Sequence, residues 1–247
     1  SKLPSFVKKI PSDYLNKFFK YSKSLGEKGM ERFNEFLNSL DNPVERYLAL
    51  VSIFTEQEKE GVLNKVEKID TNLMPLVTRK DYLNGMLEFE TKVELPDNLL
   101  MKVDKMTMAA AIEARVPFLD HKLVEFSASI PSRLKLRGLN EKYILRKAMN
   151  GIMPKRIVSR KKERFFVPID IWFTKDLREL AENVLAEGSI RKEGLLKYGY
   201  IKDILKNYKK SRLYYARQLW SLLNFELWHK MYIERGFIYN PNLKKLI

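Results

Sequence analysis

A dense run of cations lies between Lys155 and Arg164, where six basic side chains accompany a single acid, Glu163. Closely spaced cations suit a polyphosphate, because they attract and position phosphate oxygens. Phe165, Phe166 and Pro168 follow the run and predict a loop held in one shape. A solvated basic face is the alternative that the charge run by itself leaves open. The six cations are Lys155, Arg156, Arg160, Lys161, Lys162 and Arg164.

The segment from Asp97 to His121 carries acidic and basic residues at informative spacing. On a continuous helix, Asp104 and Arg115 are eleven residues apart, about three turns, so they share one face. Glu113 follows Ala110 by three residues on the apolar side, where a buried carboxylate must find a partner. A structural ion pair and a role in a site are both open for Glu113.

A third segment, Asn140 to Met149, also has cations at helical spacing. Lys142 and Arg146 lie four residues apart and are expected on one face of a helix. Like charges so spaced repel slightly, so a nearby anion would offset the repulsion. A solvated basic face again remains open.

Helices are predicted nearly throughout, because apolar residues recur at helical spacing and no convincing run of alternating strand residues occurs. Asp41 and Asn42 before Pro43 predict a cap, and Asp120 predicts another. Leu99, Val103, Met106 and Ala110 are expected on one buried helix face. Expected helices cover 14–25, 30–40, 43–54, 99–116, 121–130, 141–149, 170–187, 193–208 and 214–234, with a short helical turn and a basic loop over 154–168.

The composition bounds the class of protein. The chain has 247 residues, 45% of them hydrophobic, which is enough for a substantial core. It has no cysteine and two histidines, so no metal site is predicted. No long apolar run is present, so a cytoplasmic protein without a membrane partner is expected. The net charge of +15 favours phosphate-bearing partners or an acidic protein surface.

The fold class predicted for these residues is therefore all-α, as a single region. A lead-in over 1–94 precedes a motif-bearing core over 95–172, and C-terminal helices follow over 173–247. The ten glycines form neither of the usual phosphate-binding patterns, GxGxxG or GxxxxGK[ST]. A phosphate cradle is thus not found in the chain itself.

In this order, the three segments resemble the C-terminal half of the asparagine synthase domain of glutamine-hydrolysing asparagine synthetase and its relatives. The match is dense between Leu95 and Trp172, and the EARVPFLD sequence is its most specific part. The matching residues are Leu99, Leu100, Val103, Asp104, Lys105, Thr107, Met108, Ala109, Glu113, Arg115, Val116, Pro117, Phe118, Leu119 and Asp120, then Lys142, Ile144, Leu145 and Arg146, then Arg160, Lys162, Phe165 and Pro168.

The resemblance implies a ligase that activates aspartate with ATP and Mg²⁺ to an aspartyl-adenylate, releases pyrophosphate, and amidates the product with ammonia from glutamine. Lys162 would be the catalytic lysine, since a fixed cation stabilises charge on the departing pyrophosphate. The other implied roles are substrate binding for Glu113, Arg115, Lys142 and Arg146, binding of ATP for Arg160 together with Lys162, and structural support for Asp104 and Asp120.

Two departures from the family pattern concern neighbouring parts of the enzyme. The SGGxDSS pyrophosphate loop and the acidic motif ending in GGY do not occur here, and neither does a cysteine for glutamine hydrolysis. The family's parallel sheet and most of the nucleotide site are therefore expected upstream, either in the same protein or in a partner chain. Catalysis is not expected from these residues alone.

Two alternatives remain. A basic helical module that binds RNA or an acidic protein is one, with Tyr214, Tyr215, Arg212 and Arg217 as surface contacts. Nucleic acid is the less favoured partner, because aromatic residues at helical spacing more often belong to a core. The other alternative is a related synthetase that forms a lactam or a cyclic peptide.

Overall fold

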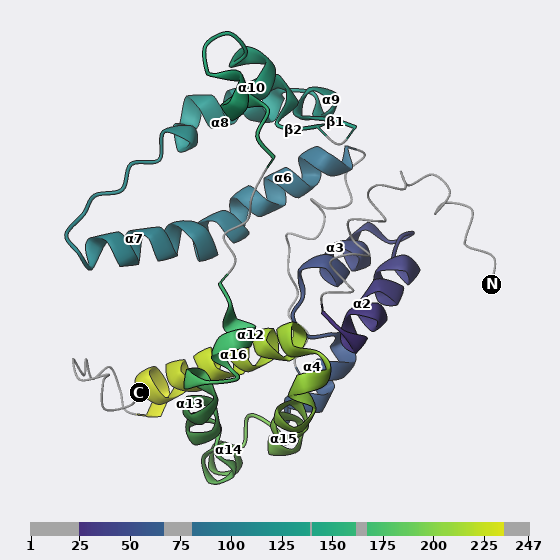
Figure 1. Cartoon of the computed structure of the whole chain (residues 1–247), viewed down its shortest axis with the longest axis vertical. Coiled ribbons are helices and arrows are strands. Elements are labelled where there is room, and N and C mark those ends of the chain that lie inside the picture. Colours follow the sequence, from purple (N-terminus) through teal and green to yellow (C-terminus); the bar gives the residue numbers. More distant parts are fainter. Residues whose placement is uncertain (1–24, 67–80, 139, 162–166, 235–247) are drawn as a thin grey trace. The chain divides into compact units, whose positions relative to one another are not determined.

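The computed structural model describes residues 25–66, 81–138, 140–161 and 167–234, and these residues are mostly helical (Figure 1). They belong to two compact units. The first unit combines 1–69 with 166–247, and the second comprises 70–165. The all-α prediction is confirmed, while the parallel sheet expected upstream stays a prediction. The expected helix over 14–25 lies outside the described residues, apart from Leu25.

The first unit contains helices from both ends of the chain. Its N-terminal elements are α2 (Glu27–Asn38), α3 (Pro43–Val51) and α4 (Glu56–Val62). Its C-terminal elements are α12 (Ile169–Trp172), α13 (Asp176–Val184), α14 (Glu187–Glu193), α15 (Tyr198–Asn207), η4 (Tyr208–Lys210), α16 (Arg212–His229) and η5 (Lys230–Glu234).

Side-chain caps fix where the N-terminal helices begin. The Asn42 side chain accepts hydrogen bonds from the backbone nitrogens of Val44 and Glu45, at 3.0 and 3.3 Å, and Pro43 occupies the first helical position. The predicted start of this helix is confirmed. It ends at Val51, three residues before the expected Phe54, because Ser52 adopts an extended conformation.

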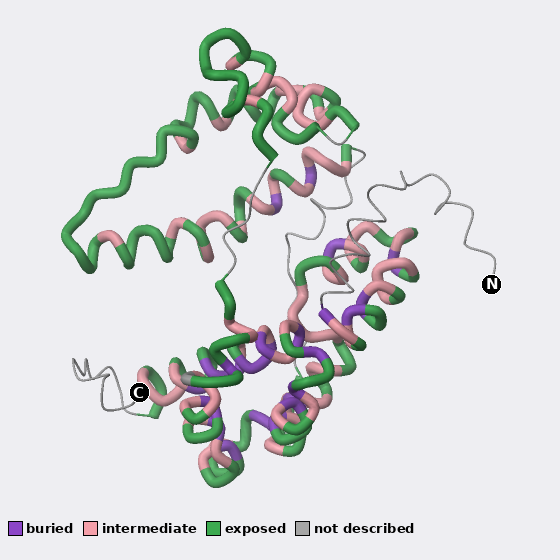
Figure 2. The backbone as a smooth tube through the Cα atoms, viewed as in Figure 1, coloured by how far each residue is buried: buried purple, intermediate pink, exposed green. Residues whose placement is uncertain are grey.

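The long helix α16 lies at the centre of the first unit and contacts α12, α13 and α15. Buried positions recur along the length of this helix (Figure 2), whereas Trp220 and Trp228 are exposed. Each fully buried aliphatic side chain contributes roughly 1.5–3 kcal/mol relative to exposure. The core comprises Val62, Phe173, Ala181, Leu185, Ile190, Leu196, Ile201, Ile204, Tyr208, Ala216, Leu219, Leu222 and Leu223.

Backbone hydrogen bonds join the two sequence-distant parts of this unit. Leu63 and Leu196 form an antiparallel bridge. The backbone nitrogen of Asn64 donates to the Leu195 carbonyl at 3.0 Å, and that of Lys197 donates to the Val62 carbonyl at 2.8 Å. These bonds place the end of α4 beside the start of α15.

Two of the three predicted C-terminal helices have different bounds in the structure. The helix expected over 170–187 is divided, because the chain turns at Phe173, whose side chain is only 2% exposed and enters the core. The helix expected to begin at Glu193 begins at Tyr198, because Gly194 has a positive φ of 69° and ends α14. The predicted helix over 214–234 is confirmed as α16 continued by η5.

The second unit is built from shorter elements. They are α6 (Tyr82–Lys92), η2 (Leu95–Leu100), α7 (Met101–Met108), η3 (Pro117–Leu119), α8 (His121–Ser129), α9 (Ser132–Lys135), β1 (Leu136–Arg137), β2 (Asn140–Glu141), α10 (Tyr143–Ala148) and α11 (Lys155–Val158). The two strands pair antiparallel, which the sequence analysis did not predict. Lys135 Nζ donates to Asn84 Oδ1 at 2.6 Å and so links α9 to α6. Burial lowers the pKa of Lys135, and the Asp81 carboxylate opposes that change.

Little apolar surface is buried in the second unit. Across 81–138 and 140–161, Phe89 is the only large hydrophobic side chain that is buried. The expected buried face is wrong for these residues, since Leu99, Val103 and Met106 are 50%, 41% and 69% exposed. Ala110 is exposed as well, because the helix ends before it. The helical face is present, but the described residues of the unit leave it exposed.

The predicted motif-bearing core over 95–172 rests on the family resemblance, with the lead-in 1–94 and the C-terminal helices 173–247 on either side, whereas the two units are defined by contacts. The second unit contains most of the motif-bearing stretch.

Among the helices of the described residues, none combines the length and the apolar character that a membrane span requires.

Tyr208 provides a test of the first unit's core. Its hydroxyl donates to the Asp170 carbonyl at 2.8 Å, and burial raises its pKa to about 12, with a further contribution from the Asp170 carboxylate. Because the folded pKa lies above the ordinary value of about 10, this stabilisation is complete below pH 10 and is lost as pH rises towards 12.

We expect Tyr208→Phe to lower the free energy of unfolding by about 1 kcal/mol at pH 8, through loss of the hydrogen bond. The deficit should shrink between pH 10 and 12, as measured by urea unfolding at pH 8 and pH 11. Tyr198→Phe is the matched control, because no hydrogen bond of its hydroxyl occurs among the described residues. A deficit of equal size at both pH values would contradict the assignment.

Candidate functional site

Every site residue predicted for the ligase belongs to the second unit. Asp104 lies on α7, Glu113 and Arg115 follow that helix, and Asp120 precedes α8. Lys142 and Arg146 lie at α10, and Arg160 follows α11. Lys162, the predicted catalytic residue, lies outside the described residues.

The helix that carries Asp104 ends earlier than expected. Ala111 has a φ of 54°, and its backbone nitrogen donates to the Met108 carbonyl at 3.0 Å. The next nitrogen, of Ile112, donates to the Thr107 carbonyl at 2.9 Å, which completes a Schellman C-cap. The predicted continuation to Val116 is therefore wrong. Asp104 and Arg115 do not share a helix face.

Glu113 lies in the non-helical segment after this cap. Its Oε1 is 2.6 Å from Arg115 Nη2, and the two side chains are 69% and 82% exposed. The expected burial of Glu113 is wrong, because the segment leaves the helix before reaching it. Such an exposed pair stabilises the fold by about 1 kcal/mol at most. Both charged groups thus remain accessible to a ligand, and no hydrogen bond in the described part of the chain joins them to α10.

Asp120 is the last residue of the EARVPFLD segment. Its Oδ1 accepts hydrogen bonds from the backbone nitrogens of Lys122 and Leu123, at 3.1 and 3.2 Å, and so caps α8. The predicted cap is confirmed. For Asp104, whose side chain is exposed on α7, the structural role stays a prediction.

Arg146 makes the most extensive polar contacts of the predicted site residues. Nε donates to the Glu141 carbonyl and Nη2 to the Arg160 carbonyl, both at 3.1 Å, while Nη1 donates to the Val158 carbonyl. One guanidinium group therefore connects three backbone carbonyls. It holds the segment after α11 against the start of α10.

Lys142 precedes α10 as its N-terminal cap residue. Its φ and ψ of 56° and 37° are left-handed, and its carbonyl accepts from the Arg146 nitrogen at 3.0 Å. The expectation that Lys142 and Arg146 share a helix face is only partly met, because Lys142 lies just outside the helix. The Lys142 side chain is exposed, and its role in substrate binding stays a prediction.

The segment held by Arg146 is strongly basic. Lys155, Arg156, Arg160 and Lys161 are all exposed there, and their charges are available to phosphate oxygens. These residues fit the phosphates of ATP, although none of them is a carboxylate that would bind Mg²⁺. These exposed cations could therefore bind an anion next to the backbone segment that Arg146 holds in place.

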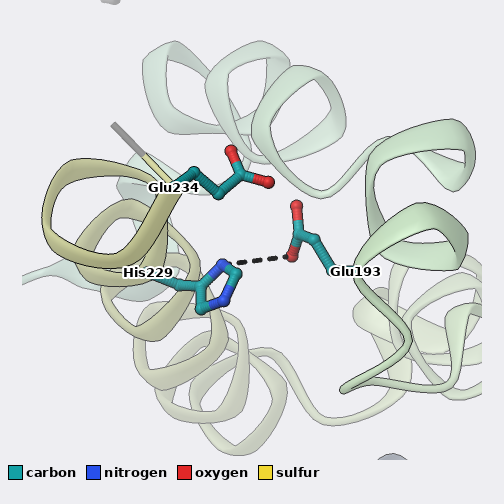
Figure 3. A group of neighbouring side chains, drawn as sticks. All are labelled: Glu193, His229 and Glu234. Atoms are coloured by element: carbon teal, nitrogen blue, oxygen red, sulfur yellow. Dashed lines mark ion pairs between the residues drawn. The ribbon is translucent and has the colours of Figure 1, made fainter. Parts of the chain in front are cut away.

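A group of side chains in the first unit was not predicted. Glu193, His229 and Glu234 converge there, with one potential ligand atom of each within 4.8 Å of the others (Figure 3). His229 and Glu234 are close in sequence, but Glu193 comes from another helix. Spacing in the sequence therefore gives no sign of the group.

The aromatic contacts proposed for RNA binding are not all at the surface. Tyr214 is buried, and its hydroxyl donates to Glu58 Oε1 and Oε2 at 2.9 and 2.8 Å. Burial raises the pKa of Tyr214, and the Glu58 carboxylate raises it further. Tyr214 is thus part of the core and is not available for base stacking.

Comparison with known proteins identifies the class. The sequence pattern of the asparagine synthase family matches residues 9–230, so the chain belongs to that family. It is 30% identical over 203 residues to asparagine synthetase [glutamine-hydrolyzing] 1 of Bacillus subtilis, covering 78% of the chain and 31% of the relative. It is 42% identical over 131 residues to the B. subtilis synthetase numbered 3, covering 52% of the chain and 21% of the relative.

A putative asparagine synthetase [glutamine-hydrolyzing] of Mycobacterium bovis is 33% identical over 145 residues, covering 58% of the chain and 22% of the relative. The chain thus spans about a third or less of the length of these relatives. No solved structure matches the chain significantly.

The Arg146 contacts predict local stability of the basic segment. We expect Arg146→Ala to accelerate hydrogen exchange about tenfold or more at the amides of Ser159 and Arg160, because charged hydrogen bonds to two carbonyls of the segment are lost. Lys147→Ala is the control, since it removes an exposed charge from the same helix. Equal exchange in the two variants would show that the guanidinium does not hold the segment.

Proposed function

We propose that this chain is the C-terminal part of an ATP-dependent amide ligase that forms asparagine from aspartate. The observation that carries the proposal is the family match over 9–230. Support comes from the relatives, which are named as glutamine-hydrolysing asparagine synthetases. Because each of them is much longer, the complete reaction would also require a nucleotide-binding part and a glutaminase part.

In the proposed reaction, the side-chain carboxylate of aspartate attacks the α-phosphorus of ATP. The bond to the β-phosphate oxygen breaks, and pyrophosphate leaves. Ammonia derived from glutamine then attacks the acyl carbon of the aspartyl-adenylate, which releases AMP and leaves the amide. The first step brings anions together and concentrates charge on the leaving group, so a fixed cation stabilises its transition state preferentially.

Lys162 is the proposed cation, with Arg160 as a second contact to the phosphates. Arg146 would act as a positioning residue and not as a direct ligand, because its guanidinium already donates to three carbonyls. The Arg160 carbonyl is one of these, and Lys162 follows it by two residues. Holding the backbone at that point would restrict where the lysine ammonium can reach.

The second unit would supply the surface on which the nucleotide-binding part packs. Its exposed apolar side chains occur through the most family-like stretch of the sequence, and burial of such side chains is favourable. Glu113 and Arg115 lie within the same stretch, so the substrate side of the site would form at this contact. The exposed side chains include Leu99, Met101, Val103, Met106, Met108, Ile112, Val116, Phe118 and Phe126.

The function is tested by supplying the nucleotide-binding part, fused or co-expressed, and measuring aspartate-dependent exchange of pyrophosphate into ATP. We expect exchange in the reconstituted protein and a loss of about 10²–10³-fold in Lys162→Ala, because a charge contact at the transition state is removed. Lys147→Ala is the matched control, because it removes an exposed charge outside the basic segment, and it should retain most of the activity.

Undiminished exchange in Lys162→Ala would contradict the role of this lysine. Absence of aspartate-dependent exchange, together with salt-sensitive binding to mixed-sequence RNA, would instead favour the basic binding module. Exchange that depends on a different carboxylic acid would favour a synthetase that makes another amide.

A further inference from the structure

The group formed by Glu193, His229 and Glu234 has the composition of a metal site. The side chains come from the last residue of α14, the last of α16 and the last of η5, and they point toward one another (Figure 3). Glu193 and His229 are well buried, with side-chain exposures of 3% and 14%. This enclosure distinguishes the group from acidic clusters at a surface, which hydration stabilises without an ion.

The contact between His229 and Glu193 is not a hydrogen bond. His229 Nδ1 and Glu193 Oε2 are 3.8 Å apart, and Nδ1 is buried without a hydrogen-bond partner in the described ranges. A buried nitrogen left in this state is unfavourable by about 1–3 kcal/mol. This distance is too long for a direct hydrogen bond. An ion placed between the two atoms could contact both of them.

A second observation comes from Glu226, one helical turn before His229. Its side chain is fully buried, and its Oε2 has no hydrogen-bond partner in the described part of the chain. Its Oε1 lies 2.8 Å from Lys230 Nζ, which also donates to the Val184 carbonyl at 2.9 Å.

Acidic side chains outnumber basic ones around this group. Glu193, Glu226 and Glu234 are accompanied by Lys230, which already pairs with Glu226. Buried polar groups are stable when they are paired, hydrogen-bonded or bound to a metal. A divalent cation between Glu193 and His229 would give both side chains a partner.

We propose that Glu193, His229 and Glu234 bind one divalent first-row transition metal ion, with Zn²⁺ as the best match. An imidazole nitrogen with two carboxylates favours Zn²⁺ over Ca²⁺ or Mg²⁺, which prefer oxygen ligands. Tetrahedral zinc with bonds of about 2.1 Å separates its ligand atoms by roughly 3.4 Å. The observed 3.8 Å between Nδ1 and Oε2 approaches that value, so small side-chain rotations suffice.

The surrounding residues support such a site. Ser189 Oγ donates to Glu193 Oε1 at 2.9 Å, which orients the carboxylate and leaves Oε2 toward His229. With three protein ligands, solvent would complete the coordination. The ion would join the end of α14 to the end of α16, so its main effect is to stabilise the first unit. This proposal does not depend on the ligase function, whose residues lie in the second unit.

The test uses the full chain without a histidine tag, stripped of metal with a chelator and then titrated with Zn²⁺ by calorimetry. We expect one Zn²⁺ per chain and a melting temperature that rises with Zn²⁺ concentration. Glu234→Gln should weaken binding by at least roughly tenfold, because loss of even an outer-shell partner has such effects. Glu234 is exposed, so this variant leaves the buried core intact.

His229→Ala is the second variant, and His121→Ala is its control because His121 is an exposed residue of the second unit. Binding should be lost in the first and unchanged in the second, with circular dichroism as a check on folding. Absence of stoichiometric Zn²⁺ binding in the wild type would overturn the proposal. Unchanged affinity in Glu234→Gln or in a folded His229→Ala chain would overturn it as well.

Discussion

The two units differ in how far they remove apolar surface from water. In the first unit, α16 contacts α12, α13 and α15, and its buried side chains join a core to which Val62 of α4 also contributes. In the second unit, helices form with apolar faces that the described residues of the unit leave exposed, and Phe89 alone is buried among its described large hydrophobic residues. The proposal that another part of the ligase packs there follows from this difference.

Local polar contacts give the second unit definite shape despite its small core. The Asp120 cap, the Schellman cap at Ala111 and the three carbonyl contacts of Arg146 each fix the backbone near a family motif residue. Such contacts do not need a large core, because they satisfy backbone groups at helix ends and turns. Groups in the proposed ligase site would thus be oriented before the apolar surface is covered.

The sequence allowed prediction of features with local physical causes. Asn42 and Asp120 were identified as caps because a short polar side chain accepts backbone hydrogen bonds, and both predictions are confirmed. The end of α7 was missed because Ala111 occupies a left-handed position where glycine is the usual signal. Gly194 did carry that signal, and the helix after it begins four residues later, at Tyr198.

Features that depend on distant residues were not predictable. The burial of Leu99, Val103 and Met106 was inferred from helical spacing, which identifies an apolar face but not whether another element covers it. The contacts of Arg146 with carbonyls at 141, 158 and 160 likewise depend on the path of the backbone. Family resemblance placed the site residues in one stretch, but it did not distinguish the positioning role proposed for Arg146 from substrate binding.

We propose that the apolar surface of the second unit is the contact surface for a nucleotide-binding part. Hydrogen exchange across 99–126, measured in the isolated chain and in its complex with that part, tests this contact. We expect slower exchange over 99–126 in the complex, with α16 unchanged as an internal reference. Unchanged exchange over 99–126 in a complex that catalyses pyrophosphate exchange would contradict the proposed contact.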